Sequence, residues 1–280
     1  MSHAGTKAEV PLLAKPHELR VALGEHVSEA DSKAALESGE CGFVHSFITG
    51  STVDGPGVRI VAWLTACQFR CVYCHNPDTW KLNNGLPVTV TRAVEVLKQY
   101  RHGLGVMRGG LTISGGEPLM QHRFVLKTFA AARKLGIHTA LDTNGYLGDR
   151  LSDEDLKGVD LVLLDLKAMT PDLHRRLVGM DNQPVHDFAR RLAHLRKPVW
   201  VRFVLVPGWT DDPAEVERIA AFAAGLGNVE RVDVLPFHQL GRFKWEKLGM
   251  DYKLKDTAPP SGATADAAIA RFRAAGLKAF

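Results

Sequence analysis

Six short apolar segments, separated by stretches of helical periodicity, constrain the fold of this chain more than any other feature. They are mostly rich in Val, Ile and Leu and nearly continuous in apolarity, which is typical of parallel strands buried on both faces. The alternation predicts an α/β fold with right-handed crossovers, either a partial (β/α)₆ barrel of the TIM-like type or a doubly wound sheet. The predicted strands are Arg59–Leu64, Leu111–Ser114, His138–Leu141, Leu161–Leu164, Trp200–Val206 and Arg231–Leu235.

The segments between these strands carry apolar residues at helical spacing and therefore predict helices. The last helix has Thr264 as a candidate N-cap and Gly276 as a candidate stop. We find no internal repeat, low-complexity tract or second domain in this pattern. The predicted helices are Thr91–Tyr100, Arg123–Leu135, Pro171–Leu177, Asp187–Leu195, Pro213–Leu226 and Thr264–Ala275.

The first 41 residues differ in character from the rest of the chain. They contain an amphipathic stretch, Lys15–Val27, that predicts a short helix, followed by a polar segment rich in Ala, Ser and Glu. We assign them no function, because N-terminal segments of this kind are commonly peripheral. We therefore expect a single domain over residues 42–280, preceded by an N-terminal extension over residues 1–41.

Charge and hydrophobicity argue against several classes of protein. The 280 residues include 35 Lys and Arg against 31 Asp and Glu, and this excess of +4 is too small to indicate a nucleic-acid-binding protein. No window approaches the roughly 18 apolar residues of a membrane span. Residues 1–20 also lack the apolar run of a secretory signal peptide. We expect a cytoplasmic protein that binds neither membranes nor nucleic acid.

Three of the four cysteines, Cys67, Cys71 and Cys74, lie within eight residues directly after the first predicted strand. A secreted protein would spread its cysteines to link distant segments, so this cluster indicates chemistry and not disulfides. Three thiolates on one loop can hold three corners of an iron–sulfur cluster and leave the fourth iron open. Zinc is the alternative, because Cys41 or His75 could supply a fourth ligand. Without such a role, Cys41 is an ordinary thiol.

Polar side chains follow several predicted strands where each strand ends. Asp142, Asp165, Lys167 and His238 all lie at or just past carboxyl ends, and this edge is where parallel α/β folds bind ligands. The two aspartates and the lysine would be costly to bury without partners, so they pair with a ligand or with each other. Arg202, on the fifth strand, either binds a carboxylate or the protein substrate, or forms an ion pair at the strand edge.

The cysteine motif resembles that of the radical S-adenosylmethionine enzymes, and further segments are similar to the family of pyruvate formate-lyase activating enzymes. These segments run in the family's order from about Gly42 to the C-terminus, whereas the first forty residues and Pro118 differ from it. The resemblance implies the partial (β/α)₆ barrel. The similar segments are His45–Phe47, Thr52–Arg59, Tyr73–Trp80, Ser114–Glu117, Leu141–Gly145, Leu164–Lys167, Val206–Trp209 and Leu235–His238.

The resemblance also implies the cofactors and the residues that hold them. Cys67, Cys71 and Cys74 would bind a [4Fe–4S] cluster, and S-adenosylmethionine would chelate its open iron. A monovalent cation near Asp142, Thr143 and Asp165 belongs to the same expectation. The residues implied to contact S-adenosylmethionine are Tyr73, Cys74, His75, Gly116, Asp165, Leu166, Lys167 and His238.

The implied activity is the generation of a glycyl radical on pyruvate formate-lyase, with reduced flavodoxin or ferredoxin as the electron donor. A ferredoxin-like insertion, found in many activases of other glycyl radical enzymes, would need about eight more cysteines. Only Cys41 lies outside the triad, so such an insertion is excluded. Two alternatives remain at this point: a radical enzyme acting on a small molecule or another glycyl radical protein, and a zinc-stabilised binding module.

Overall fold

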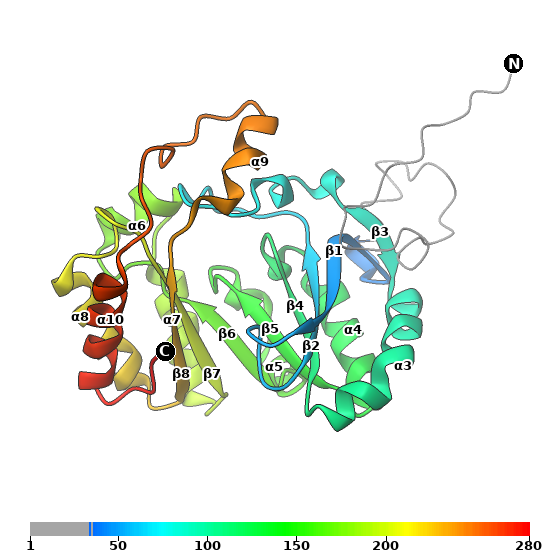
Figure 1. Cartoon of the computed structure of the whole chain (residues 1–280). Coiled ribbons are helices and arrows are strands. Elements are labelled where there is room, and N and C mark those ends of the chain that lie inside the picture. The colour runs from blue at the N-terminus through cyan, green and yellow to red at the C-terminus, as the bar shows by residue number, and fades with distance from the viewer. Residues whose placement is uncertain (1–33, 35) are drawn as a thin grey trace, which may run out of the picture. The chain divides into compact units, whose positions relative to one another are not determined.

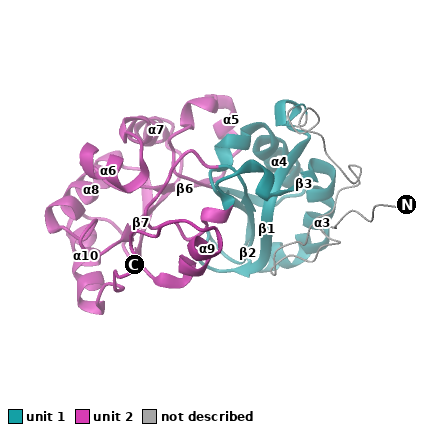
Figure 2. Ribbon diagram, turned by 90° about the horizontal axis from the view of Figure 1, so that it is seen from above, with its two compact units in different colours: residues 1–66, 79–141 teal, residues 67–78, 142–280 magenta. Residues whose placement is uncertain are grey.

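The computed structural model in Figure 1 describes residue 34 and residues 36–280. The predicted helix Lys15–Val27 lies outside the described residues. The described part divides into two compact units, which Figure 2 shows in different colours. Unit 1 comprises the described residues up to 66 together with residues 79–141, and unit 2 comprises residues 67–78 and 142–280. Among the described residues, no helix combines the length and the apolarity needed to cross a bilayer.

Unit 1 is built on a sheet in which three parallel strands are followed by two antiparallel ones. β2, β4 and β5 are parallel, while β1 pairs antiparallel with β2 on one side and with β3 on the other. Helices α3 and α4 pack against each other, and α4 also contacts β1 (Figure 1). Val61, Ile113 and Leu141 fill the core from β2, β4 and β5. The elements are β1 (Cys41–Ser51), β2 (Arg59–Leu64), η2 (Leu82–Asn84), β3 (Leu86–Thr89), α3 (Val90–Val106), β4 (Gly110–Gly115), η3 (Pro118–Gln121), α4 (His122–Lys134) and β5 (His138–Thr143), whose last two residues belong to unit 2.

A buried arginine joins the three parallel strands of unit 1 near their first residues. Arg59 opens β2 and is fully buried. Its guanidinium donates to the Thr112 hydroxyl at 3.0 Å and to the Leu111 carbonyl at 2.6 Å, both on β4. It also lies 3.2 Å from Nδ1 of His138, the first residue of β5. Because a buried guanidinium needs hydrogen bonds to replace its hydration, Arg59 fixes the register of these strands.

Unit 2 contains three parallel strands, β6, β7 and β8, with helices packed beside them. Burial alternates along β7: one face is fully buried, while Trp200, Arg202 and Val204 on the other face are half-buried. The helix side of the sheet is therefore the apolar core, and the opposite face carries polar groups. The elements are η1 (Pro77–Thr79), which reaches unit 1 at its last residue, η4 (Gly148–Arg150), α5 (Asp153–Lys157), β6 (Leu161–Asp165), α6 (Pro171–Val178), α7 (Gln183–His194), β7 (Val199–Leu205), α8 (Pro213–Leu226), β8 (Val229–Pro236), η5 (Gln239–Gly241), α9 (Arg242–Lys247) and α10 (Gly262–Ala274).

The six predicted strands are confirmed as β2, β4, β5, β6, β7 and β8. The six helices predicted after residue 42 are present within four residues of their expected bounds, except that α3 extends six residues beyond its predicted end. Three points are corrected. The N-cap of α10 is Ser261, whose hydroxyl accepts from the Thr264 amide at 3.1 Å, so Thr264 already lies inside the helix. The antiparallel strands β1 and β3 were not expected. The short helices α5 and α9 were not expected either.

Candidate functional site

The cysteine loop, residues 67–74, is held in unit 2 by the C-terminal end of α6. The Arg70 amide donates to the Val178 carbonyl and the Val72 amide to the Leu177 carbonyl, both at 2.9 Å. Carbonyls in the last turn of a helix have no partner within the helix, so the loop supplies the donors that α6 lacks. Between the first two cysteines, the buried ring of Phe69 provides a hydrophobic anchor for the loop.

Two aromatic rings pack against the side chain of Phe69. Its ring packs edge-on against Tyr146 and His174, with centroids 5.5 and 5.7 Å away. Burial lowers the pKa of His174 to about 4, although its Nδ1 lies 2.7 Å from the Met180 carbonyl. This imidazole is therefore neutral at physiological pH, donates to that carbonyl and acts as a packing surface beneath the cysteine loop.

None of the three loop cysteines forms a disulfide; Cys71 is buried, and Cys67 and Cys74 are half-buried. Burial raises the pKa of the Cys71 thiol, and the nearby charge of Lys167 acts in the opposite direction. Among the described residues, no three His, Cys, Asp or Glu side chains converge on one metal position. Thiolates are the ligand type that iron–sulfur clusters take, each on a different iron. The chemistry of the three cysteines on this loop fits a [4Fe–4S] cluster, which Cys67, Cys71 and Cys74 would hold.

The segment after β6 places a lysine–aspartate pair beside the cysteine loop. Lys167 Nζ lies 3.0 Å from Asp165 Oδ2, and the two side chains are 10% and 25% exposed. The same ammonium lies 5.5 Å from the centroid of the Tyr73 ring. Burial alone would lower the pKa of Lys167, but the Asp165 carboxylate together with Tyr73 and Cys71 outweighs burial and holds that pKa well above its usual value. Leu166, between them, is buried and donates its amide to the Arg202 carbonyl.

A second ion pair joins the end of β5 to the middle of β7. Arg202 Nη1 lies 2.8 Å from Asp142 Oδ2, and both side chains are largely buried. The Thr143 hydroxyl accepts from the Gly145 amide, which closes the turn after β5. Of the two roles considered for Arg202, the structure displays the ion pair.

Sequence reasoning missed a side-chain bridge between the end of β5 and the cysteine loop. Gln68 Nε2 donates to Asn144 Oδ1 at 3.0 Å. Asn144 Nδ2 in turn lies 4.0 Å from the Cys67 sulfur. The only sequence signal was the position of Asn144 just past a strand, which does not identify its partner.

The two predicted histidines lie together under α9. The rings of His75 and His238 pack edge-on with centroids 5.0 Å apart. Burial, and next the proximity of His238, lower the pKa of His75. The backbone passes so closely here that a Cβ on Gly241 would lie 2.8 Å from the His75 carbonyl oxygen. Trp245 on α9 donates its indole N–H to the Cys74 carbonyl at 2.9 Å, a contact that sequence reasoning did not foresee.

Gly116, the remaining predicted residue, belongs to unit 1, where it follows β4. Its amide donates to the Leu64 carbonyl at 2.8 Å, at the end of β2. The preceding Gly115 has φ of +128°, and a Cβ there would lie 2.1 Å from the Leu64 oxygen. Only glycine allows this approach. The buried Glu117 side chain then caps η3 by accepting from the Leu119 amide.

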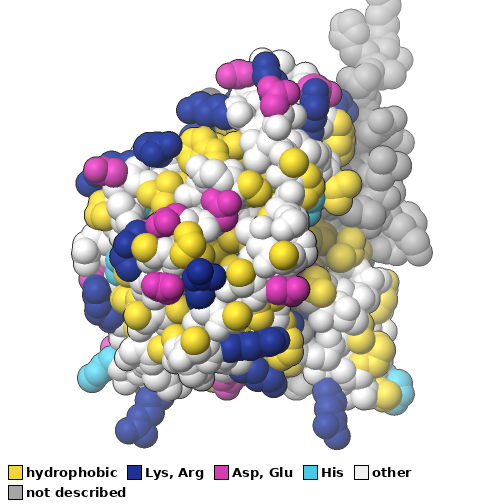
Figure 3. Space-filling view, turned by 60° about the vertical axis from the view of Figure 1, so that its left-hand side comes forward, with side chains coloured by type: hydrophobic (Ala, Val, Ile, Leu, Met, Phe, Trp, Pro, Cys, Tyr) yellow, Lys and Arg dark blue, Asp and Glu magenta, His cyan; other side chains and the backbone are white. Residues whose placement is uncertain are grey.

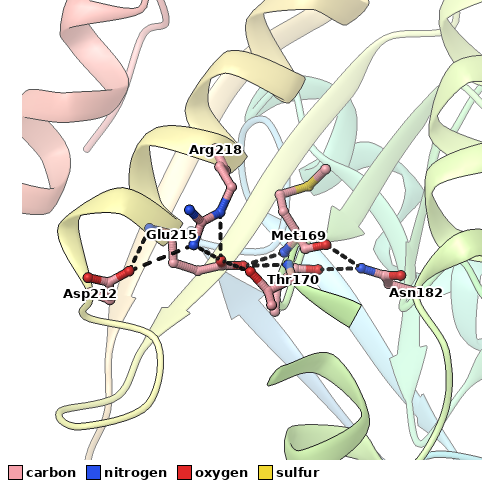
Figure 4. A network of polar contacts seen from close by, with 7 residues as sticks. Met169, Thr170, Asn182, Asp212, Glu215 and Arg218 are labelled. Carbon is pink, nitrogen blue, oxygen red and sulfur yellow. Dashed lines mark hydrogen bonds and ion pairs between the residues drawn. The ribbon is translucent and has the colours of Figure 1, made fainter. Parts of the chain in front are cut away.

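A buried polar network holds the loop that leads from Asp165 into α6 (Figure 4). The Glu215 carboxylate, on α8, accepts from the backbone amides of Met169 and Thr170 and from the Thr170 hydroxyl. Asn182 donates to the Met169 carbonyl at 2.7 Å and to the Ala168 carbonyl at 3.2 Å. The structure thus fixes this loop from both sides, and none of these residues was singled out from the sequence.

The chain is similar to proteins of one superfamily. Residues 62–222 match the family model of the Radical SAM superfamily. The chain is 45% identical over 225 residues to the pyruvate formate-lyase 1-activating enzyme of Escherichia coli (strain K12), which covers 80% of this chain and 92% of that protein. It is 43% identical over 234 residues to the pyruvate formate-lyase-activating enzyme of Staphylococcus aureus (strain USA300), covering 81% and 93%. The chain belongs to the pyruvate formate-lyase activating enzymes of the radical SAM superfamily.

Solved structures of this superfamily have the same fold. A domain of the pyruvate-formate lyase-activating enzyme from Bacteroides vulgatus matches with a TM-score of 0.52 and 26% identity, covering 61% of this chain and 98% of that one. A radical SAM methyltransferase from Sphaerobacter thermophilus matches with a TM-score of 0.58 and 19% identity, covering 84% and 72%. These matches confirm the predicted fold class, the mostly parallel α/β partial barrel. Membership of the superfamily implies a [4Fe–4S] cluster and S-adenosylmethionine as cofactors.

Proposed function

We propose that this protein activates pyruvate formate-lyase by generating a glycyl radical on it. The observation that carries the proposal is that one unit combines three cysteines on a single loop, none of them in a disulfide, with the Lys167–Asp165 pair beside Cys71 and Tyr73. Bound together, a reduced [4Fe–4S] cluster and S-adenosylmethionine supply a 5′-deoxyadenosyl radical that abstracts hydrogen from a backbone glycine.

The chain's own residues bind and orient these groups. Cys67, Cys71 and Cys74 hold three irons as thiolates. Asp165 and Lys167 present one anionic and one cationic group to the zwitterionic, sulfonium-containing cofactor. The remaining contacts with the cofactor are proposed for Tyr73, Cys74, His75, Gly116, Leu166 and His238. No protein acid or base is needed for the hydrogen transfer, because the cofactor performs the chemistry.

Several finer assignments belong to the same proposal. The electron comes from reduced flavodoxin or ferredoxin, because clusters of this kind need donors near about −400 mV or lower. Asp142, Thr143 and Asp165 would hold a monovalent cation. The protein works in the cytoplasm, where thiols stay reduced. Residues 42–280 form the catalytic domain, and residues 1–41 are an extension.

The test is radical formation on the partner. The reconstituted and reduced protein is mixed with pyruvate formate-lyase and S-adenosylmethionine, and a glycyl radical is sought by electron paramagnetic resonance. A peptide with the target glycine deuterated at Cα should also transfer deuterium into 5′-deoxyadenosine. Cofactor cleavage with neither deuterium transfer nor a glycyl radical would instead favour a radical enzyme acting on a small molecule. A chain that binds one zinc and no iron would favour the binding module.

A further inference from the structure

Helix α6 connects the two loops on which the proposed site depends. Its N-terminal end follows directly from the loop that starts at Asp165. Its C-terminal carbonyls, Leu177 and Val178, accept hydrogen bonds from the cysteine loop. A helix is stiff over eight residues, so a shift of α6 at its first turn is transmitted to the cysteine loop at its last turn. A group that fixes the first turn of α6 therefore sets the distance between the two loops.

Glu215 is the residue that fixes the start of α6. Its side chain is 1% exposed. The carboxylate accepts from five donors: the Met169 and Thr170 amides, the Thr170 hydroxyl, and Nε and Nη2 of Arg218. Hydrogen bonds from a backbone amide to a carboxylate are shorter and stronger than neutral ones. The Thr170 residue held in this way is also the N-cap of α6, whose own side chain makes no capping bond.

The position of Glu215 differs from that of an ordinary acidic residue in the first turn of a helix. Such a residue usually serves the helix on which it lies. In α8 that task is done by Asp212, whose carboxylate accepts from the Glu215 amide at 3.1 Å. The Glu215 carboxylate can therefore accept hydrogen bonds from a segment 45 residues earlier in the chain. Arg218 also donates to the carboxylate, so the negative charge of Glu215 is paired within the network.

We infer that Glu215 is a positioning residue for S-adenosylmethionine binding: it fixes the backbone of Met169 and Thr170, and thereby the spacing between Asp165–Lys167 and the cysteine loop. The inference rests on the proposed function, since it assigns Glu215 to the same site. Glu215 does not touch the proposed cofactor residues and acts only through the loop and α6.

The decisive variant is Glu215→Gln. One oxygen remains to accept from the amides, but an NH₂ group now faces the Arg218 guanidinium, which is itself a donor. The matched control is Glu217→Gln on the same helix, because Glu217 is 65% exposed and pairs only with Arg271 in the contacts described for it. A second variant, Thr170→Val, removes one donor to Glu215 while keeping the carboxylate and the shape of the side chain.

Three measurements are compared across these proteins: iron content, the dissociation constant for S-adenosylmethionine by titration calorimetry, and amide hydrogen exchange of Met169 and Thr170 in the metal-free chain. We expect Glu215→Gln to keep its iron, to bind the cofactor about tenfold more weakly, as substitutions of outer-shell partners do, and to exchange those two amides faster. Thr170→Val should show a smaller loss, and Glu217→Gln should match wild type.

Unchanged cofactor affinity in Glu215→Gln, even with faster exchange or a lower melting temperature, would reduce Glu215 to a structural residue and overturn the inference. If Glu215→Gln does not fold, the affinity of Thr170→Val decides in the same way. Failure of the wild-type protein to bind S-adenosylmethionine is a different result, because it would overturn the proposed function itself and the inference with it.

Discussion

The cysteine loop and the loop between β6 and α6 lie in the same unit, yet different kinds of contact hold them. The cysteine loop relies on two backbone hydrogen bonds to the end of α6, the packing of Phe69 and the bridge from Gln68. The β6–α6 loop is held by a largely buried ion pair, a buried carboxylate and the amide of Asn182. Apart from the Arg70 guanidinium, which donates to the Cys67 and Phe69 carbonyls, the groups that hold the cysteine loop are neutral, whereas those that hold the second loop include charged side chains.

This difference indicates which loop is preorganised. Charge-assisted hydrogen bonds in a buried setting are strong, and they are costly to leave half-made. The β6–α6 loop should therefore keep its conformation without any bound group. The cysteine loop carries two half-buried thiols, and metal binding contributes directly to the stability of the segment that supplies the ligands. We expect the cluster itself to order that loop.

The largest effect should follow from removing a thiolate. Because each of Cys67, Cys71 and Cys74 is proposed to hold a separate iron, replacing any one of them by Ala should abolish stable cluster assembly and radical formation. Cys41→Ala is the control, since Cys41 is a buried thiol on β1 in unit 1. Iron content and the visible absorption of the reconstituted proteins measure the outcome. Loss of the cluster in Cys41→Ala would contradict the three-ligand assignment.

The next largest effect should follow from removing the Glu215 carboxylate, which holds the β6–α6 loop. Glu215→Ala leaves two amides and a hydroxyl without their acceptor and removes one of the two carboxylates that pair with Arg218. Each donor left without an acceptor costs about 1–3 kcal/mol, so we expect the unfolding free energy to fall by about 3 kcal/mol. Glu217→Ala should stay within about 0.5 kcal/mol of wild type, as exposed substitutions do. Urea denaturation at neutral pH measures both, and equal stabilities of the two variants would remove the contrast between the loops.

The parallel strands could be predicted because they are short, apolar and bounded by helices. The two antiparallel strands could not, for identifiable reasons. β1 mixes Gly, Ser, Thr and His with its apolar residues, so neither continuous apolarity nor strict alternation marks it. β3 has four residues and contains Pro87, which normally argues against a strand and is tolerated here because β3 is at the edge of the unit 1 sheet. Helix α9 could not be predicted because it is short: its six residues, Arg242–Lys247, lie between two glycines at positions 241 and 249.

The candidate site was predicted unevenly for a related reason. Residues proposed to contact a cofactor lie in compact motifs after strands, so the candidates between Cys67 and His75 and from Asp165 to Lys167 could be named from the sequence and its resemblance to the family. Residues that hold those motifs in place do so across the chain. Glu215 looks like any acid near the start of a helix, and Trp245 looks like a core aromatic. Only the fold brings them to Thr170 and to Cys74.

A smaller effect is expected at the ion pair itself. Asp165→Asn keeps the shape of the side chain but removes the negative charge beside Lys167. If Asp165 contacts the cofactor, the dissociation constant for S-adenosylmethionine should rise measurably. The unfolding free energy should fall by about 2 kcal/mol, because the largely buried Lys167 ammonium keeps an oxygen acceptor but loses the charge of its partner. Calorimetric titration and urea denaturation separate the two quantities. A folded variant with wild-type affinity would show that the pair with Lys167 is only structural.

The smallest expected effect is a pH dependence of the unfolding free energy, caused by the Glu215 carboxylate that holds the β6–α6 loop. Burial alone would raise the pKa of Glu215, but hydrogen bonds from Thr170, Arg218 and Met169 outweigh it and lower that pKa. A carboxyl group with a lowered pKa in the folded state contributes stability above its unfolded pKa, about 4.3, and loses it as the pH falls through the folded value.

Other charged groups in this region must be separated from Glu215. Arg218 and Asp212 lie on α8, and His186, on α7, has a pKa lowered chiefly by burial. Comparing wild type with Glu215→Gln removes their common contribution, since all three remain in both proteins. The difference in unfolding free energy between the two should be largest at neutral pH and should shrink as the pH falls below the unfolded pKa of about 4.3 and through the lower folded value. If the difference in unfolding free energy stays constant over this pH range, the charge of Glu215 does not stabilise the β6–α6 loop. The two loops would then differ in how their side chains pack and not in charge.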